Sequence, residues 1–362
     1  MKTKSTRLFG LLRGFTALLV ALLVAFILVF ITSDEPFKAL ENLLITPLTN
    51  WNRISTVLTR MIPIVFTGLA VCVMFSADQF NLAGEGCVFA GGFAAGLCAV
   101  YLDLPAGIHT VVCLLAAMLV GAIIMLVPAL LKAKLGASEM VVSLMMNYVI
   151  LDVCLHFLHT YFKDRSQGAT MTLPFQSTSI LGTMFQGTRT SWGLLIAIVA
   201  SVLVWLFMFR TKWGYAIRMV GINREFSKYS GIKVGFIIVL CQVVGGLISG
   251  LGGGVEQLGY YQTFRWIQLM GYGWDGVTLA ILAGNNPLLV PVAAFFIAYL
   301  DYGCTLMNTN TSVPAEMMDI ISVVIFLFFA AEQFLKRTRQ RMVVKETERE
   351  LAEVKAEEVS AE

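Results

Sequence analysis

The stretch Arg210–Lys233, RTKWGYAIRMVGINREFSKYSGIK, is the largest polar island in the middle of an otherwise apolar chain. It lies between two long apolar runs and carries six basic residues against the single acid Glu225. An excess of Lys and Arg in a short loop between membrane spans places that loop on the cytoplasmic side. The stretch therefore predicts a polytopic membrane protein and sets the orientation of the spans on either side of it.

The island itself is expected to fold into two short helices. The apolar residues of the first helix recur at helical spacing: Tyr215, Met219 and Ile222. Gly221 is expected to interrupt this helix, and Asn223 suits the N-cap of a second helix over residues 224–230, which Gly231 ends. Two short helices at a membrane surface can serve as a lipid anchor or as a docking site for another protein, and spacing alone leaves both open.

The composition supports the membrane class. The chain of 362 residues is 57% hydrophobic and only 14% charged, whereas soluble domains are about 25% charged. The net charge of +3 does not suggest nucleic acid, because the basic residues stand at the ends of apolar segments. The seven cysteines lie within or beside apolar runs without CxxC or Cys/His pairing, which favours small buried side chains over disulfides or a metal site.

The apolar runs predict an all-α fold with about ten membrane-spanning helices. Residues 1–14 form a basic N-terminus, residues 15–335 the transmembrane domain and residues 336–362 a charged tail, with both termini in the cytoplasm. The expected spans are 15–31, 54–75, 88–101, 108–131, 139–162, 192–209, 235–251, 277–283, 288–306 and 317–334. Clustered glycines are expected to make the end of span 235–251 irregular, and residues 250–285 can hold a half-span in place of a full crossing.

Two polar segments interrupt the apolar pattern at matching places. The segment 76–86, SADQFNLAGEG, follows the second span, and the segment 256–276 follows the seventh. The pieces FNLAGEGCVFAGG and GWDGVTLAILAGN share an aromatic residue, then Asn or Asp, then Gly and an apolar run. The pattern predicts an inverted repeat with broken helices near the bilayer midplane, a common transporter plan in which the broken pair marks the pathway.

Four motifs, in order along residues 54–330, carry a family resemblance. Phe80–Gly86, FNLAGEG, resembles the F-N-[IL]-G-x-E-G signature of permease subunits of bacterial ABC importers for nucleosides and simple sugars, with Ala83 in place of the usual Gly. Glu139 and Asn147 in GASEMVVSLMMNY are similar to a second motif of that family. The island resembles its T-x-x-G-x-x-[IL]-R-A-V-G-x-N loop, and Gly273–Gly276, GWDG, resembles its G-[FWY]-D-G motif.

This resemblance implies a non-catalytic transport subunit in a bacterial cytoplasmic membrane. No Walker A motif is present in the chain, so ATP and Mg²⁺ would be bound by partner ATP-binding subunits and no cofactor by this chain. The island 210–233 would dock onto those subunits. The residues of this coupling segment that match the family are Gly214, Arg218, Gly221, Asn223, Tyr229 and Gly231. The other implied partners are a second permease chain of different sequence, an extracellular substrate-binding lipoprotein and membrane lipid, with nucleic acid excluded.

Polar residues in an apolar context are the candidates for the substrate pathway. They are Phe80, Asn81, Glu85, Asn147, Glu256, Trp274 and Asp275. Five of them have a structural interpretation as well: Asn81 and Glu85 can order a broken helix, Asn147 can bond a neighbouring helix, and Trp274 and Asp275 can serve helix packing. Glu139 suits the first turn of its helix behind Ser138 as N-cap, and His156 and His159 favour interfacial packing over a metal site.

The substrate within the importer class stays open on the sequence, and two other function classes, a secondary transporter and a membrane enzyme, have to be weighed against it. A nucleoside is the expected substrate, and a simple sugar such as ribose is the alternative within the same mechanism. A secondary transporter driven by H⁺ or Na⁺ would use Glu85, Glu256 or Asp275 as its coupling acid. A membrane enzyme would need a clustered nucleophile, base or metal set, and the sequence shows no catalytic residues and no metal ligands of that kind.

Overall fold

The computed structural model describes residues 35–166 and 168–311, together with Phe30, Val313, Ile320 and Val323. Its regular secondary structure there is helical, apart from one isolated bridge between Thr183 and Ser191, so the predicted all-α class is confirmed. Apart from the single positions just named, the expected spans 15–31 and 317–334 and the terminal segments 1–14 and 336–362 lie outside the described residues.

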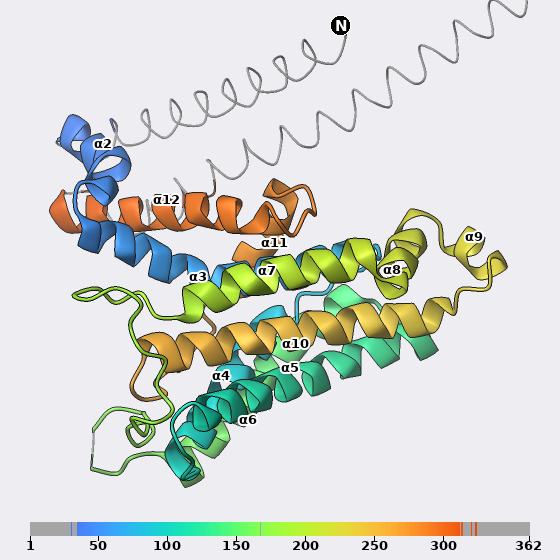
Figure 1. Cartoon of the computed structure of the whole chain (residues 1–362), viewed down its shortest axis with the longest axis horizontal. Coiled ribbons are helices and arrows are strands. Elements are labelled where there is room, and N and C mark those ends of the chain that lie inside the picture. The colour runs from blue at the N-terminus through green and yellow to red at the C-terminus, as the bar shows by residue number, and fades with distance from the viewer. Residues whose placement is uncertain are drawn as a thin grey trace, which may run out of the picture. The chain divides into compact units, whose positions relative to one another are not determined.

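Seven helices of the described part are long and apolar enough to cross a membrane. They are α3 (Trp51–Phe75), α4 (Gly84–Tyr101), α5 (Ile108–Leu135), α6 (Glu139–Phe157, continued by a π-helical turn to Phe162), α7 (Gly193–Arg210), α10 (Val234–Tyr260) and α12 (Val290–Asn310) (Figure 1). The shorter elements are α2 (Pro36–Leu44), a 3₁₀ turn (Thr46–Leu48), α8 (Lys212–Ile222), α9 (Arg224–Tyr229) and α11 (Tyr272–Leu282).

Contacts divide the chain into two units, each compact by itself. The larger unit is Leu43–Gly303 and holds α3 to α11 with most of α12. The smaller unit comprises residues 1–42 and 304–362. In its described part the amide of Asn310 donates to the side-chain oxygen of Asn42 over 3.0 Å, and the amide of Asn308 donates to the carbonyl of Val313 over 2.8 Å.

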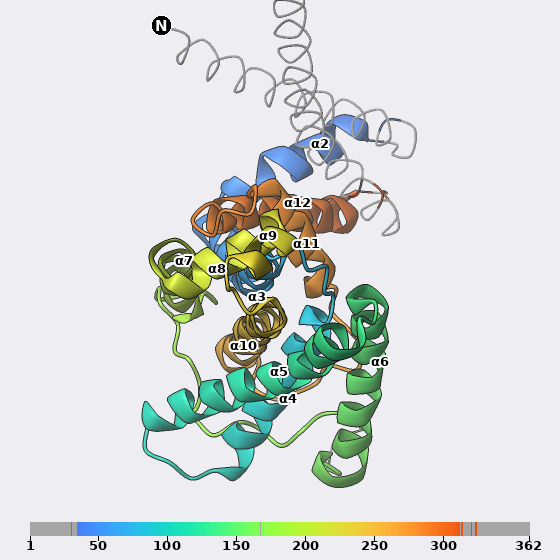
Figure 2. The same ribbon diagram turned by 90° about the vertical axis from the view of Figure 1, so that its right-hand side faces the viewer.

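Helix α10 is the centre of the larger unit, where it packs against α3, α4 and α5 (Figure 2). Glycines make this packing unusually close. A Cβ atom added at Gly91, Gly121, Gly246, Gly250 or Gly253 would come within 3.0 Å of backbone atoms of a facing helix. Small residues let helix backbones approach in membranes, where packing replaces the hydrophobic effect as the source of association. The contacts of α10 with α4 and α5 therefore form a seam of backbone against backbone, which we call the glycine seam.

The glycine seam corrects one expectation. The glycines 245–254 were expected to make the end of span 235–251 irregular, but α10 continues through them to Tyr260. Glycine lowers helix propensity by about 1 kcal/mol relative to alanine, and the close packing on α4 and α5 compensates for that loss. Glu256 consequently stands in the last turns of a helix and not in a polar loop.

Residues 261–289 hold a second correction. The apolar stretch 277–283 was counted as a crossing, but it belongs to α11, which has 11 residues and is too short to span. Within residues 250–285 the structure shows the end of α10 and the short helix α11, separated by the non-helical residues 261–271. The described residues thus contain seven candidate spans, and the total of about ten remains a prediction.

The loop 163–192 closes one end of the larger unit over the residues that follow α10. The amide of Leu181 donates to the carbonyl of Leu258 over 2.8 Å, and that of Phe175 donates to the carbonyl of Gln262 over 2.8 Å. Phe264 and Trp266 behind it are fully or almost fully buried and contact the ring of Phe89. We call this end of the helices, where α3 begins and α10 finishes, the loop end.

Candidate functional site

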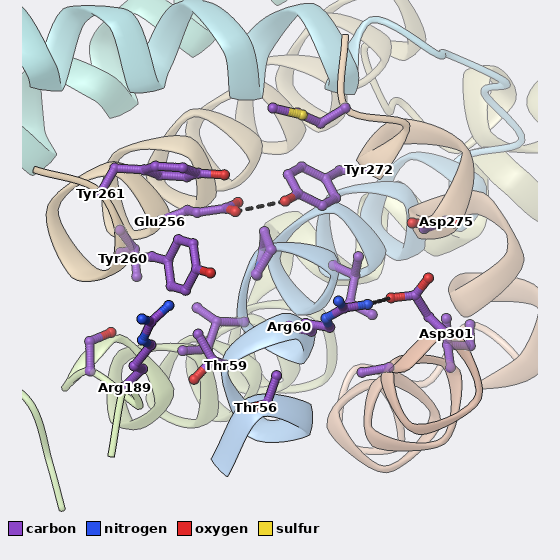
Figure 3. A pocket seen from close by; sticks show the side chains of 18 residues that line it. Thr56, Thr59, Arg60, Arg189, Glu256, Tyr260, Tyr261, Tyr272, Asp275 and Asp301 are labelled. Atoms are coloured by element: carbon purple, nitrogen blue, oxygen red, sulfur yellow. Dashed lines mark hydrogen bonds and ion pairs between the residues drawn. The ribbon is translucent and has the colours of Figure 1, made fainter. Parts of the chain in front are cut away.

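A cavity of about 480 Å³ opens at the loop end of the larger unit (Figure 3). Its walls come from the first turns of α3, the end of α10, the 261–271 segment, α11, α12 and the end of the loop 163–192. Small-molecule sites occupy about 300–1,000 Å³, so the volume suits a ligand of that class. Its polar side chains are Thr56, Thr59, Arg60, Arg189, Ser191, Glu256, Tyr260, Tyr261, Tyr272, Asp275 and Asp301.

Glu256 offers the cavity an unused hydrogen-bond acceptor. The hydroxyl of Tyr272 donates to Oε1 of Glu256 over 2.6 Å, whereas Oε2 is buried and has no hydrogen-bond partner among the described residues. The rings of Tyr260 and Tyr261 lie on either side of the Glu256 carboxylate in Figure 3. Burial raises the pKa of Tyr261, which follows the end of α10, so that its hydroxyl keeps its proton at neutral pH. This wall of the cavity therefore combines aromatic faces, a hydroxyl donor and a carboxylate acceptor.

The opposite wall carries an ion pair. Arg60 of α3 donates to a carboxylate oxygen of Asp301 on α12, and its guanidinium lies 5.2 Å from the ring centre of Tyr302. Arg189 also lines the cavity, and Asp275 lies above the pair in Figure 3. Because Arg60 and Asp301 compensate each other, this wall is polar with little net charge.

The segment 76–83 is a break between α3 and α4, and hydrogen bonds from its own Asn81 and from Asn147 of α6 satisfy backbone groups of the break and of the start of α4. Asn81 accepts from the amide of Ala83 over 2.8 Å and donates to Oε1 of Gln242 on α10 over 2.7 Å. Asn147 of α6 accepts from the amide of Gly86 and donates to the carbonyl of Leu82, each over 2.9 Å. An interrupted helix leaves backbone groups without partners, which is costly away from water. Asn81 and Asn147 are therefore buried parts of the break.

Glu85 of α4 connects this break to a second one, the non-helical residues 261–271 between α10 and α11. Its Oε1 accepts from the backbone amide of Gly271, the N-cap residue of α11, which has a φ of 83° that favours glycine. A Cβ atom at Gly273 would lie 2.7 Å from the Cβ of Glu85, so the two helix ends touch. The next residue after Gly271 is Tyr272, the donor to Glu256. A continuous path of contacts therefore runs from the first break to the cavity wall.

The polar island folds into α8 and α9, close to the prediction. Asn223 caps α9 by accepting from the amide of Phe226 over 2.9 Å, and Gly231 has a φ of 82° just after the helix. Gly221 does not interrupt α8, which corrects the expectation. It is a helical residue whose added Cβ would come within 3.0 Å of the carbonyl of Ser76, so the glycine permits α8 to press on the break.

Helices α8 and α9 contact the break and also expose large apolar side chains. Arg224 donates to the carbonyl of Asp78 over 3.0 Å, with the Asp78 carboxylate 3.4 Å away. Tyr229 is 89% exposed and Ile222 79% exposed. An apolar side chain so exposed at a polar end of the molecule favours contact with another surface.

The seven predicted pathway residues divide into separate places. Glu256 and Asp275 line the cavity, and Asn81, Glu85 and Asn147 are buried at the breaks. Phe80 stacks on Phe75 with ring centres 5.4 Å apart, and Trp274 is half exposed and outside the cavity wall. For the six predicted coupling residues, Gly214, Arg218 and Gly221 lie in α8, Asn223 and Tyr229 in α9, and Gly231 directly after it.

Sequence reasoning missed the ion pair and the tyrosines of the cavity. Arg60 and Asp301 are lone charges of opposite sign inside two apolar spans, and such residues are rare unless they pair or line a pathway. That signal was present in the sequence. Tyr272 and Tyr261 carried no such signal, because tyrosine is common at membrane interfaces.

Within the described residues no group of three His, Cys, Asp or Glu could hold a metal ion.

Two other predicted details differ from the structure or refine it. Ser138 precedes α6 but its side chain makes no capping hydrogen bond. Glu139 in the first turn instead forms an ion pair of 2.6 Å with Lys132 at the end of α5, which ties the ends of these helices together.

Comparison with known proteins identifies relatives across most of the chain. The family described as branched-chain amino acid transport system / permease component matches residues 53–330. The guanosine ABC transporter permease protein NupP of Bacillus subtilis is 30% identical over 76% of this chain and 80% of its own length. The nucleoside ABC transporter permease protein NupB of Lactococcus lactis is 28% identical over 88% of this chain and 90% of its own.

The relatives are not restricted to nucleoside permeases. The glucose ABC transporter permease protein TsgB13 of Haloferax volcanii is 29% identical over 89% of this chain and 87% of its own. The two bacteria with the nucleoside relatives each hold a second, more distant relative of this chain, NupQ in Bacillus subtilis and NupC in Lactococcus lactis.

Proposed function

This chain belongs to the family of branched-chain amino acid transport system permease components, and we propose that it forms the membrane passage of an ATP-driven importer for nucleosides. Membership of this permease family accounts for the apolar helices and for the expectation that this chain does not catalyse a reaction. The observation that carries the substrate proposal is the cavity at the loop end. Its tyrosine rings and the unused oxygen of Glu256 suit a neutral solute with a flat ring and hydroxyl or N–H donors.

The aromatic wall of the cavity favours a neutral solute with a flat ring, and two side chains of opposite charge, Arg189 and Asp275, also line the cavity. Arg60 already pairs with Asp301, and Glu256 already receives one hydrogen bond from Tyr272. An amino acid or a phosphorylated compound would need its own opposite charges to be met in the cavity. A nucleoside needs only donors, acceptors and an aromatic face. The names of NupP and NupB agree with that class.

We assign the coupling role to α8 and α9. They expose Ile222 and Tyr229 for a partner and press on the break 76–83 through Gly221 and Arg224. ATP-binding subunits that close on ATP would move these helices, and the path through Glu85 and Gly271 leads from the break to the cavity. ATP and Mg²⁺ would be bound by those subunits. Gly214, Arg218, Asn223 and Gly231 would maintain the shape of the segment.

The remaining assembly follows from the same proposal. With α8 and α9 in the cytoplasm, the loop end faces outward and receives substrate from an extracellular binding lipoprotein, and both termini lie inside. A second permease chain of different sequence completes the pore, as the paired relatives in two bacteria suggest. The two breaks, each between a long helix and a shorter one, would be related by an inverted repeat of α3–α6 with α10 and the residues that follow.

Uptake of radiolabelled uridine and guanosine by cells lacking this gene, with and without complementation, tests the proposal. We expect uptake that needs the gene, ceases on ATP depletion and resists competition by excess ribose or glucose. If the gene supports uptake of a sugar but not of nucleosides, the ATP-driven mechanism stands and the substrate is a sugar, in line with the relation to TsgB13. Uptake that survives ATP depletion but collapses with the proton gradient would exclude an ATP-driven importer.

A further inference from the structure

Helix α6 exposes a polar stripe in the middle of a membrane span. The span Glu139–Phe162 has 24 residues, and Asp152 lies near its centre with its side chain exposed. Tyr148, His156 and His159 are also exposed. Because these four residues are three or four positions apart, they share one face of the helix. We call them the α6 stripe.

The neighbouring spans show what a lipid-facing surface looks like in this chain. The exposed residues of α5 before its last turn are all apolar: Ile108, Val111, Leu115, Leu119, Ile123, Leu126 and Val127. Those of α7 before Phe209 are apolar as well: Leu195, Ile198, Val199, Val202, Leu203 and Leu206. A carboxylate facing lipid near the bilayer centre is strongly unfavourable. The α6 stripe is therefore unsuited to contact with lipid, unlike the exposed apolar faces of α5 and α7.

Apart from His156, one turn away on the same stripe, the described residues show no basic group beside Asp152. Asp152 has no hydrogen-bond or ion-pair partner among the described residues, and α6 packs on α4 with the opposite face, through Asn147. The expected spans outside the described residues, 15–31 and 317–334, contain no Lys, Arg or His. The described part of the chain thus leaves the α6 stripe open to water, a polar solute or another chain.

We propose that the α6 stripe lines the water-filled translocation passage, closed on its far side by the second permease chain, and that Asp152 meets the transported nucleoside there. The inference rests on the proposed function and locates a part of the passage that is separate from the cavity at the loop end. A carboxylate accepts two hydroxyl groups at once, which suits the vicinal hydroxyls of a ribose. The ring of Tyr148 one turn away suits the base.

Cysteine accessibility in the assembled importer, in membrane vesicles, tests this inference. Asp152→Cys and the matched lipid-facing Val199→Cys on α7 are treated with the membrane-impermeant reagent methanethiosulfonate ethylsulfonate, and the unsubstituted complex gives the background of native cysteines. We expect Asp152→Cys to react at least tenfold faster than Val199→Cys, and added uridine to slow the reaction severalfold. Tyr148→Cys, on the same face, replaces Asp152→Cys if that variant does not assemble.

Two results would overturn the inference. An unreactive Asp152→Cys that crosslinks to the second permease chain would show a dry protein interface. An unreactive Asp152→Cys together with full uptake by Asp152→Leu would show a lipid-facing residue. Both results leave uptake by the unsubstituted complex untouched. Failure of the proposed function would instead appear as loss of ATP-dependent nucleoside uptake in that unsubstituted complex.

Discussion

At the residue scale, Glu256 is the group on which the substrate proposal depends most directly. One oxygen of its carboxylate accepts from Tyr272 and the other is buried without a donor among the described residues. Leaving a buried acceptor unpaired is costly, so a ligand that brings a donor to this oxygen would gain a hydrogen bond there.

We expect Glu256→Leu to raise the KM for nucleoside uptake about tenfold, the equivalent of one hydrogen bond of about 1.4 kcal/mol. Glu256→Gln keeps an acceptor and should raise KM only about two- to threefold. Initial uptake rates over a range of uridine concentrations measure both. Tyr272→Phe is the control, because it removes the neighbouring donor and leaves the carboxylate. A Gln variant as inactive as the Leu variant would instead point to a titrating carboxylate and to ion coupling.

Gly221 provides a second test at this scale. A Cβ atom there would meet the carbonyl of Ser76, whereas one at Gly235 in α10 would meet nothing within 4 Å. We expect Gly221→Ala to destabilise the purified complex by about 1–3 kcal/mol through overpacking, and the matched Gly235→Ala to be neutral or to stabilise it by up to about 1 kcal/mol through helix propensity. Thermal unfolding of the two variants side by side measures the difference. Equal melting temperatures would mean that α8 does not rest on the break.

At the element scale, α8 and α9 are connected to the first break by few contacts, and Arg224 is the main polar one. We expect Arg224→Ala to reduce the uptake rate about tenfold while ATP hydrolysis by the complex continues, because the movement of α9 no longer reaches Asp78. Lys212→Ala removes a charge from the same segment and has no partner among the described residues, so it serves as the control. ATPase activity and uptake measured on one preparation give the coupling ratio. A ratio unchanged in Arg224→Ala would contradict this route.

The same scale shows which elements could be predicted from the sequence. Helices α3, α5, α6, α7 and α12 follow their apolar runs closely, since a span needs a run of sufficient length. The point where α10 ends and the short length of α11 could not be predicted from the apolar runs. Whether glycines 245–254 break a helix depends on the facing glycines of α4 and α5, and these contacts are long-range. For the site, the two breaks were identified by Asn and Glu in apolar surroundings, but the convergence of Glu256, Tyr272 and Arg60 required the fold.

At the scale of the whole molecule, the seven cysteines are all free thiols, six of them buried, and Cys98 is the partly exposed one. We expect a maleimide to label Cys98 fastest in the folded complex and to label all seven in the denatured chain without any reductant. Mass spectrometry of this subunit counts the labels. Fewer than seven labels before reduction, rising to seven after it, would contradict the prediction of small buried thiols.

The glycine seam also limits where this molecule can bend. Where side chains separate two helices, one helix can slide because rotamers rearrange, but backbones in direct contact have no such layer to rearrange. Helices α4, α5 and α10 should therefore move together as one rigid body. Residues 76–83 and 261–271, the non-helical stretches that adjoin α4 and α10, are then where we expect the chain to bend, and they should tolerate added rigidity least.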